Sequence, residues 1–319
     1  MVTGGAGYIG SHTAKELARA GFEPIVFDNF SQGHRWAVKR GPVVEADLGD
    51  IAAISRAVVD YRIEAVIHFA ANAYVGESME HPRKYMRDNI VNTLNLLTAL
   101  LDSGVKRIIF SSSCTTYGVP ESLPIAEHHP QRPVNPYGES KLFIERTLHW
   151  YGSAYGLQWM VLRYFNAAGA DPEGELGEHH DPETHLIPLV LQTALGQRRE
   201  LQVYGVDYGT SDGTAVRDYI HVTDLAKAHS RSLEHLLAGG ESTALNLGTG
   251  HGHSVREVIR CAEKVAAKVI PVRECPRRAG DPPVLVADAR KAASVLNWCP
   301  LHSDIETIVR TAWDWHRKH

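Results

Sequence analysis

The chain has 319 residues, and its 33 lysines and arginines against 37 aspartates and glutamates give a formal charge of −4. A folded chain of this length buries roughly three quarters of the surface that its unfolded form exposes, so it needs no metal or disulfide to complete its core. The composition, 44% hydrophobic and 22% charged, excludes collagen-like, disordered and coiled-coil chains, and the scattered charges give no basic stripe for nucleic acid.

The first half of the chain alternates short β-branched runs with helical patterns. We expect strands at 24–27, 42–46, 65–69, 107–110 and 160–164. We expect helices at 11–20, 51–61, 82–103 and 137–155. This alternation predicts an α/β fold of the Rossmann type, a doubly wound parallel sheet with helices on both faces. The longest apolar runs fall far short of the roughly 20 residues that span a bilayer, so no membrane partner is expected.

The second half has a different character. Residues 167 to about 218 are rich in Gly, Pro, Asp and His, and helices alternate with one or two strands from 255 to 319. We interpret these parts as a smaller, mixed α/β substrate-binding lobe. The helical 222–237 and the strand-like 244–247 are expected to return to the sheet. The predicted domains are therefore interleaved: 1–166 plus about 219–250, and about 167–218 plus 251–319.

The N-terminus and the cysteines bear on location. Met-Val-Thr-Gly-Gly has neither the basic nor the long apolar region of a secretory signal, and the four cysteines show no CxxC spacing. Both features predict a cytoplasmic protein. Only three residues precede Gly4, fewer than the roughly five of a usual strand, so either the first strand is short or residues before Met1 are missing.

A glycine-rich turn at residues 3–10 leads into the first expected helix. Gly4, Gly7 and Gly10 permit a tight turn and a close approach of the backbone to a pyrophosphate at the helix N-terminus. Asp28, 21 positions after Gly7, ends the next strand, where a carboxylate accepts from both ribose hydroxyls and repels a 2′-phosphate. The pattern thus predicts NAD rather than NADP. Asp47 either meets the adenine or is a solvated loop residue.

A second group of residues points to proton transfer. Ser113 follows the strand 107–110, and Tyr137 and Lys141 are spaced to lie on one helix face, about 6 Å apart. A phenol with a pKa near 10 must lose about three pKa units to act as a base at neutral pH, which requires roughly 4 kcal/mol. A neighbouring ammonium and a positive nicotinamide ring can supply this stabilisation.

These motifs together resemble the extended short-chain dehydrogenase/reductase family, and within it the UDP-glucose 4-epimerases. The segments that carry the resemblance are TGGAGYIGSH at 3–12, HFAA at 68–71, VGES at 75–78, SSSCTTYG at 111–118, NPYGESK at 135–141, LRYFNAAGADPEGELGE at 162–178, DGTAVRDYIHVTDLA at 212–226, NLGTG at 246–250 and RRAGD at 277–281. The stretch around VGES is also similar to the epimerases that interconvert UDP-xylose and UDP-arabinose. The resemblance covers nearly the whole chain.

The resemblance implies a reaction and its catalytic residues. Tyr137 would take the proton of the sugar 4-hydroxyl while hydride passes from C4 to tightly held NAD. The 4-keto sugar would then turn over and take the hydride back on its other face, so that UDP-glucose and UDP-galactose interconvert. Ser113 would hydrogen-bond the 4-oxygen, and Lys141 would hold the nicotinamide ribose and lower the pKa of Tyr137.

The resemblance also implies contacts to cofactor and substrate. The implied cofactor contacts are Gly4, Gly7, Tyr8, Ile9, Gly10, Asp28, Asn29, Asp47, Leu48, Phe69, Ala70, Ala71, Asp88, Tyr137, Lys141 and Phe165. The implied UDP-sugar contacts are Ser113, Tyr137, Asn166, His185, Leu201, Tyr204, Arg217, Arg278, Asp281 and Leu285. Among these, Asn166, Arg217 and Arg278 would meet the phosphates, Asp281 the uridine ribose and Tyr204 the uracil. Phe165 would lie beside the sugar or in the core.

The chain departs from the family pattern at several positions. Ala73 stands where these epimerases often have Lys, and Asp88 and His185 stand where they often have Asn. Leu285 stands where the family varies between Tyr and smaller residues in a wall of the sugar pocket, and our hypothesis is that it leaves room for a 2-acetamido group. The Ser113-Cys114-Thr115 run lacks the carboxylates that sugar-nucleotide dehydratases carry there.

Alternatives remain open at this point. The alternative substrates are UDP-xylose with UDP-arabinose, or UDP-N-acetylhexosamines; a net oxidoreductase or a non-catalytic dinucleotide sensor is a different function. The histidine cluster Glu178-His179-His180-Asp181 with His185 has no HExxH helix or Cys partner, so we expect solvated loop histidines and no metal site. The helical segments 82–103 and 137–155 have more apolar positions than a sheet face needs, which predicts a homodimer.

Overall fold

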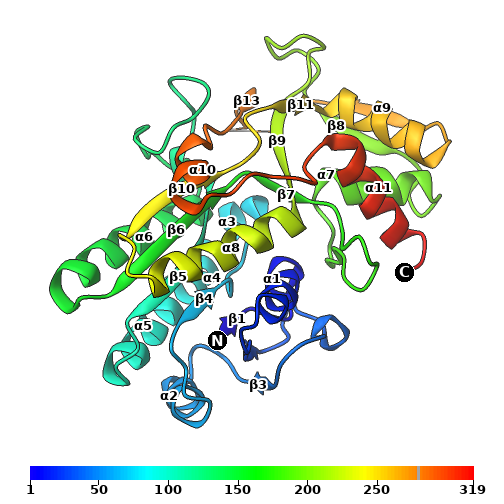
Figure 1. Cartoon of the computed structure of the whole chain (residues 1–319). Coiled ribbons are helices and arrows are strands. Elements are labelled where there is room, and N and C mark those ends of the chain that lie inside the picture. The colour runs from blue at the N-terminus through cyan, green and yellow to red at the C-terminus, as the bar shows by residue number, and fades with distance from the viewer. Residues whose placement is uncertain (279–280) are drawn as a thin grey trace. The chain divides into compact units, whose positions relative to one another are not determined.

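The computed structural model describes residues 1–278 and 281–319 (Figure 1). The chain folds into two compact units. The first contains residues 1–118, 130–163 and 226–245, and the second contains residues 119–129, 164–225 and 246–319. Among the described residues, no helix is both long and apolar enough to cross a membrane.

Seven strands form the main sheet, in the order β10-β6-β5-β4-β1-β2-β3. They are β1 (Val2–Thr3), β2 (Val26–Asp28), β3 (Val43–Glu45), β4 (Val66–His68), β5 (Arg107–Ser113), β6 (Gln158–Tyr164) and β10 (Thr243–Leu247). β1 pairs in parallel with β2 and β4, and parallel pairing continues from β2 to β3 and from β4 to β5. The predicted Rossmann-type sheet is confirmed. Its strand order reverses between β1 and β4, which is where doubly wound sheets bind ligands.

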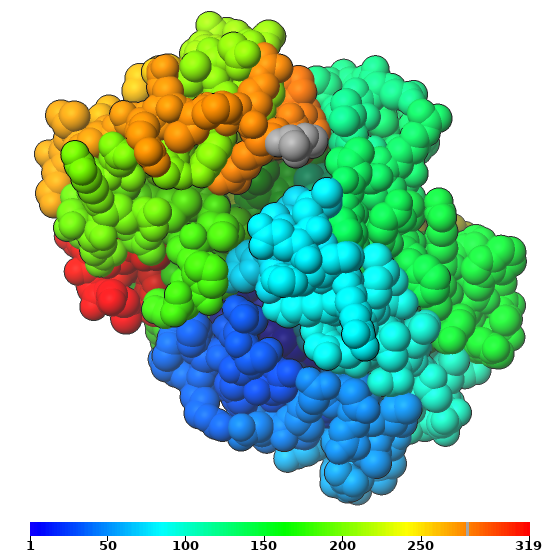
Figure 2. Space-filling view, turned by 180° about the vertical axis from the view of Figure 1, so that it is seen from behind, coloured from blue at the N-terminus to red at the C-terminus, as the bar shows by residue number. Residues whose placement is uncertain are grey.

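Helices flank this sheet (Figure 1). They are α1 (Tyr8–Arg19), α2 (Ile51–Asp60), α3 (Val75–Glu80), α4 (Pro82–Tyr85), α5 (Asn92–Asp102), α6 (Pro136–Tyr155) and α8 (Val222–Leu237), with 3-10 turns at Arg35–Ala37 and Cys114–Tyr117. The helix expected at 82–103 is divided, because a π-helical turn at Met86–Val91 separates α4 from α5. Figure 2 shows the region of α3 to α5, in cyan, at the molecular surface.

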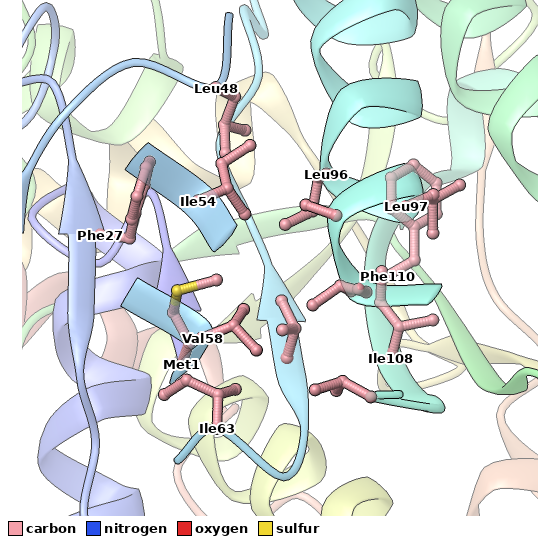
Figure 3. Close-up of a cluster of buried hydrophobic side chains, with 14 of the residues drawn as sticks. Met1, Phe27, Leu48, Ile54, Val58, Ile63, Leu96, Leu97, Ile108 and Phe110 are labelled. Carbon is pink, nitrogen blue, oxygen red and sulfur yellow. The ribbon is translucent and has the colours of Figure 1, made fainter. Parts of the chain in front are cut away.

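The main core of the first unit lies against α2, α5 and α6. Figure 3 shows Ile54 of α2, Leu96 of α5 and Ile108 of β5 converging, and all three side chains are fully buried. Burial of one such side chain contributes about 1.5–3 kcal/mol. This packing holds the strands in register and so fixes the loops that follow β1, β4 and β5.

The second unit is mixed α/β. Its strands are β7 (Asn166–Ala168), β8 (Leu201–Tyr204), β9 (Val216–His221), β11 (Gly252–Ser254), β12 (Val272–Cys275) and β13 (Val284–Leu285). Its helices are α7 (Leu186–Ala194), α9 (Val255–Ala266), α10 (Arg290–Leu296) and α11 (Ile305–His316). β9 pairs in parallel with β7 and β13 and antiparallel with β11, while β8 pairs in parallel with β12. Apolar side chains of α7, α9 and α11 form one core with β8.

One short segment joins the second unit from within the first half of the sequence. The backbone N–H of Ile125 donates to the Val286 carbonyl at 2.8 Å, and the N–H of Asp288 donates to the Ile125 carbonyl at the same distance. The Asn246 side-chain amide also donates to the Ile125 carbonyl, at 2.8 Å. These bonds tie residues 119–129 to the second unit although their neighbours belong to the first.

Candidate active site

The glycine-rich turn connects β1 to α1. Gly4 has a φ of +70°, and a Cβ on it would lie 2.6 Å from the backbone nitrogen of Ala70. A Cβ on Gly10 would lie 2.2 Å from the Gly4 carbonyl oxygen. Gly7 precedes the helix, and no side chain caps the helix N-terminus there. The first turn of α1 contains the expected contacts Tyr8, Ile9 and Gly10. The turn thus presents backbone N–H groups at a helix start, which fits the pyrophosphate of a dinucleotide.

One acidic side chain ends β2 and another lies two residues after β3. Asp28 accepts hydrogen bonds from the backbone N–H of Ala6 at 2.9 Å and of Phe30 at 2.8 Å. Burial raises the pKa of Asp28, and both hydrogen bonds act in the opposite direction. The Asn29 amide donates to Asp47 at 2.6 Å. Asp28 is therefore fixed next to the glycine turn, where a carboxylate suits an adenosine ribose.

The segment after β4 is bonded to the same turn. The backbone N–H groups of Phe69 and Ala70 both donate to the Thr3 carbonyl, at 2.9 and 3.2 Å. The Phe69 ring lies 4.6 Å, centre to centre, from the ring of His229. Ala71 follows and is half-buried. Three of the expected cofactor contacts thus line the edge at which the sheet order reverses.

Two further expected cofactor contacts have partners within the protein. Leu48 is 6% exposed and packs in the core of the first unit. Asp88 lies in the π-helical turn, pairs with Arg87 at 2.6 Å and accepts from the Asn72 amide at 2.9 Å. These partners lower the pKa of Asp88, although burial opposes them. The residue at this position is therefore an ionised, hydrogen-bonded carboxylate.

Helix α6 brings two of the expected catalytic residues to one face. The Asn135 side chain accepts the Gly138 N–H at 2.8 Å and so caps the helix at its start. A Cβ on Gly138 would lie 2.7 Å from the Thr115 carbonyl oxygen, so the first turn of α6 is pressed against the 3-10 turn that follows β5. This contact places Tyr137 and Lys141, one helical turn apart, beside the end of β5.

The structure confirms that Ser113, Tyr137 and Lys141 lie together. Ser113 hydrogen-bonds to the Tyr137 side chain, and its Oγ accepts from the N–H and the hydroxyl of Thr115 at 3.2 and 3.0 Å. The Lys141 ammonium donates to the Ser111 carbonyl at 2.8 Å, and its Nζ lies 5.7 Å from the centre of the Tyr137 ring. A phenol, a hydroxyl and an ammonium in this arrangement can transfer a proton and stabilise the resulting charge.

Burial dominates the electrostatics of this site. It raises the pKa of Tyr137 to about 12, against the lowering effect of the Ser113 hydrogen bond. It also lowers the pKa of Lys141 to about 7, although the Glu145 carboxylate acts in the opposite direction. Burial thus opposes the expected lowering of the Tyr137 pKa and outweighs the Ser113 hydrogen bond.

The sequence did not indicate a buried ion pair behind the site. Glu145 and Arg163 meet at 2.6 Å with side chains that are 6% and 7% exposed. The Ser112 hydroxyl donates to Glu145 at 2.5 Å, and Arg163 donates to the Tyr117 hydroxyl at 2.9 Å. The pair joins α6 to β5 and β6. The only signal in the sequence was the position of Glu145 one helical turn after Lys141.

A buried asparagine next to Asp88 was also missed. The Asn89 amide donates to Ser140 Oγ at 3.0 Å and to the Asn72 carbonyl at 3.0 Å. The Ser140 hydroxyl in turn donates to the Tyr137 carbonyl at 2.7 Å. This chain of bonds fixes the π-helical turn to the first turn of α6.

In the second unit, expected substrate contacts gather around β9. The Asn166 amide donates to the Asp218 carbonyl at 3.1 Å. Arg217 forms an ion pair with Asp281, and Leu285 of β13 lies directly opposite Arg217 in the parallel pairing. A guanidinium, a carboxylate and an aliphatic side chain thus adjoin one another, as recognition of a phosphorylated nucleoside requires.

The other expected substrate contacts differ in how far they are buried. The Arg278 guanidinium lies 4.1 Å from the centre of the Tyr204 ring, so the two form a stacked pair. Phe165 is 7% exposed. Leu201 is 2% exposed and packs in the core of the second unit.

His185 lies just before α7, in a cluster with Glu178, His180 and Glu183. Its Nδ1 is 2.7 Å from Glu178 Oε1. Of the histidines expected to be solvated, His179 and His185 are exposed and His180 is half-buried, whereas Glu178 beside them is buried at 3% exposure. The two carboxylates raise the pKa of His185 to about 10, although burial opposes them.

Comparison with known proteins assigns the family. The model of the NAD dependent epimerase/dehydratase family matches residues 1–248. A UDP-glucose 4-epimerase of Rhizobium leguminosarum bv. trifolii is 51% identical over 318 residues, 100% of this chain and 97% of that protein. The crystal structure of a UDP-glucose 4-epimerase from Brucella ovis in complex with NAD is 53% identical, with a TM-score of 0.96 over 98% of this chain and 96% of that one. A UDP-glucose 4-epimerase from Stenotrophomonas maltophila with bound NAD and formylated UDP-arabinopyranose is 40% identical, with a TM-score of 0.96 over 99% and 97% of the chains. This chain therefore belongs to the NAD dependent epimerase/dehydratase family.

Proposed function

We propose that this chain inverts the configuration at C4 of a UDP-sugar, with UDP-glucose and UDP-galactose as the substrate pair, through a transient 4-keto intermediate. The observation that carries this proposal is the grouping of Ser113, Tyr137 and Lys141 at the end of β5, in a chain half identical to a UDP-glucose 4-epimerase along its whole length. NAD supplies the acceptor and donor of the C4 hydride. The reaction has no net redox change, so it consumes no cofactor.

The protein residues have separate roles in this reaction. Tyr137 accepts the proton of the sugar 4-hydroxyl and later returns it. Ser113 donates a hydrogen bond that favours the charged form of Tyr137. The Lys141 ammonium, held by the Ser111 carbonyl, adds positive charge on the same side of the phenol. Positive charge on the bound cofactor is needed as well, because burial raises the pKa of Tyr137 to about 12 in the unliganded protein.

A test of this function uses the purified protein without added cofactor. It is incubated separately with UDP-galactose, UDP-xylose and UDP-N-acetylgalactosamine, and the anomeric and H4 protons are followed by NMR. Conversion to the C4 epimer is expected, without release of reduced cofactor that absorbs near 340 nm. If no conversion occurs even with NAD supplied, the proposal fails and a non-catalytic dinucleotide sensor becomes the better hypothesis.

The choice of sugar depends on the second unit. The Stenotrophomonas relative binds a UDP-pentose derivative, which keeps UDP-xylose and UDP-arabinose as the second candidate pair. Leu285, opposite Arg217, has a smaller side chain than tyrosine, and we propose that it admits a 2-acetamido group. Leu285→Tyr is then expected to lower turnover of UDP-N-acetylglucosamine relative to UDP-glucose. Equal turnover ratios in the two proteins would contradict this role.

We propose that the two units bind different ligands. The first unit would bind NAD through the glycine-rich turn and Asp28, and the second would bind the UDP-sugar through Asn166, Arg217 and Asp281, with Arg278 and Tyr204 nearby. We place the activity in the cytoplasm, because the four free cysteines fit a reducing compartment. We place it within galactose metabolism because UDP-galactose is one of the two proposed substrates.

We also propose that the protein is a homodimer. On α6, Phe143 and Trp150 are seven residues apart, hence on one face, and are 47% and 69% exposed. Val91, in the π-helical turn, is 50% exposed. Large apolar side chains at helical spacing favour a partner of the same kind, since a two-fold axis repeats the patch on both subunits.

Light scattering after size-exclusion chromatography tests the dimer. The wild type is expected at twice the mass of one chain. Trp150→Asp is expected to shift it toward one chain, whereas Val59→Asp, at a 67% exposed position on α2, is the matched control and leaves the mass unchanged. A monomeric wild type would refute the dimer.

A further inference from the structure

Four side chains in the loop before α7 converge on one point. Glu178 and His180 are two residues apart, and Glu183 and His185 repeat this spacing five residues later. One ligand atom of each lies within 4.8 Å of the others. His185 Nδ1 is 2.7 Å from Glu178 and 3.4 Å from Glu183, and His180 Nδ1 is 3.3 and 3.6 Å from the same carboxylates. Each imidazole nitrogen therefore faces both carboxylates.

The centre of this cluster is buried. Glu178 is 3% exposed, and its buried Oε1 atom lies 2.7 Å from His185 Nδ1 and 3.3 Å from His180 Nδ1. The side chains of Glu183 and His180 are 4% and 18% exposed, whereas His185 is 47% exposed. Two carboxylates removed from water need positive charge beside them. Either protonated imidazoles, or a bound metal ion with neutral imidazoles, can supply that charge here.

The loop that carries the cluster is held in place. Glu183 Oε1 accepts from the backbone N–H of Thr184 at 2.7 Å and of His185 at 2.8 Å. The Trp315 ring of α11 lies so close to Gly177 that a Cβ there would be 2.3 Å from it. Hydrogen bonds to a ligating carboxylate orient it, as outer partners do in known metal sites.

We propose that Glu178, His180, Glu183 and His185 form a structural site for a divalent transition-metal ion, with zinc as the best match. Zinc takes four nitrogen and oxygen ligands at about 2.0–2.2 Å in tetrahedral geometry, which separates neighbouring ligand atoms by about 3.3 Å. The four nitrogen–oxygen distances between these side chains, 2.7 to 3.6 Å, lie on both sides of that value. Two imidazoles favour zinc over magnesium or calcium, which prefer oxygen ligands alone.

Zinc retention tests the site directly. The purified, chelator-treated protein is incubated with zinc chloride, desalted and analysed by elemental mass spectrometry. About one zinc ion per chain is expected. Glu178→Gln and His180→Gln each remove a ligand and are expected to retain less than about a tenth of that amount. Glu175→Gln is the matched control, because Glu175 belongs to an acidic trio in the same loop, and it is expected to retain zinc as the wild type does.

Two measurements keep the proposal falsifiable if a variant folds poorly. Cobalt(II) bound to the wild type is expected to show the strong visible absorption of a tetrahedral site, and zinc is expected to raise the thermal midpoint of the wild type and of Glu175→Gln only. No zinc on the wild type, or equal zinc on Glu178→Gln, would leave only imidazole–carboxylate ion pairs and overturn the site. Loss of zinc in Glu175→Gln would show an adventitious cation and overturn it as well. None of these readings depends on epimerase activity.

Discussion

Replacement of Lys141 by methionine is expected to stabilise the unliganded protein at neutral pH while removing a group that the proposed reaction needs. Lys141 is 3% exposed, and burial lowers the pKa of its ammonium from 10.5 to about 7. This shift corresponds to about 5 kcal/mol in favour of the neutral amine in the folded chain. Methionine is unbranched and adaptable and carries no charge, so it occupies the same space without that cost.

The sign of the pH dependence follows from the two pKa values. Between pH 7 and 10.5 the unfolded chain keeps the Lys141 proton and the folded chain releases it, so the wild type gains stability as the pH rises. Below pH 7 both states hold the proton, and the full cost is present. The gain in the free energy of unfolding that Lys141→Met brings over the wild type therefore falls by about 4 kcal/mol between pH 6.5 and pH 10. Loss of the bond to the Ser111 carbonyl subtracts about 1–2 kcal/mol at every pH, which leaves the variant about 3 kcal/mol more stable at pH 6.5.

Denaturant unfolding followed by tryptophan fluorescence measures this difference. Nucleotide-free protein is used at one fixed concentration, because bound ligand and subunit association both contribute to stability. Lys106→Met, at an exposed position, is the control and should show no pH-dependent difference from the wild type. A Lys141→Met variant that is less stable at pH 6.5, or a difference that does not change with pH, would refute the reasoning. Either result would mean that the folded chain stabilises the ammonium.

Three other substitutions test separate parts of the first unit. Tyr137→Phe removes the proton-transferring hydroxyl and keeps the ring, so kcat should fall by about 10²–10⁴-fold while NAD released by denaturation stays at the wild-type amount. Gly10→Ala places a Cβ 2.2 Å from a carbonyl oxygen of the glycine-rich turn and should abolish NAD retention, whereas Gly76→Ala meets nothing within 4 Å and should not. Arg163→Met leaves the Glu145 carboxylate buried without its cation and should lower the free energy of unfolding by about 3–5 kcal/mol. An unchanged rate, unchanged NAD content or unchanged stability would contradict the respective step.

The sequence predicts the parts of the site that depend on local spacing. Tyr137 and Lys141 are one helical turn apart. Asn135 followed by Pro136 is a typical start of a helix, so the sequence indicates where α6 begins. The strand ranges were nearly right, because β-branched runs between glycines fit buried parallel strands. β5 is longer than expected, because the strand continues through Ser111, Ser112 and Ser113, which are buried. The serines therefore lie in the strand rather than after it.

The sequence does not predict which ionisable residues are buried. Glu145 and Arg163 are 18 positions apart, and charged residues are normally exposed, so nothing local indicates that they pair inside the fold. Glu178 lies in a loop rich in glycine and charge, which made a solvated cluster the natural expectation. Glu178 is buried because α11 packs against this loop, and that contact joins residues about 140 positions apart. The π-helical turn at Met86–Val91 was missed because its apolar spacing still reads as helix.

The buried charges of the first unit differ in how they are compensated, and this difference bears on function. Arg163 has a carboxylate partner in Glu145, so its charge is permanent. Lys141 donates to the neutral Ser111 carbonyl. The carboxylate of Glu145, one helical turn away, is bound to Arg163, so it does not form an ion pair with Lys141. A group with a pKa of about 7 changes its charge readily when its surroundings change. Because an ammonium at this distance favours the Tyr137 phenolate, a ligand that keeps Lys141 protonated would also prepare the proton acceptor.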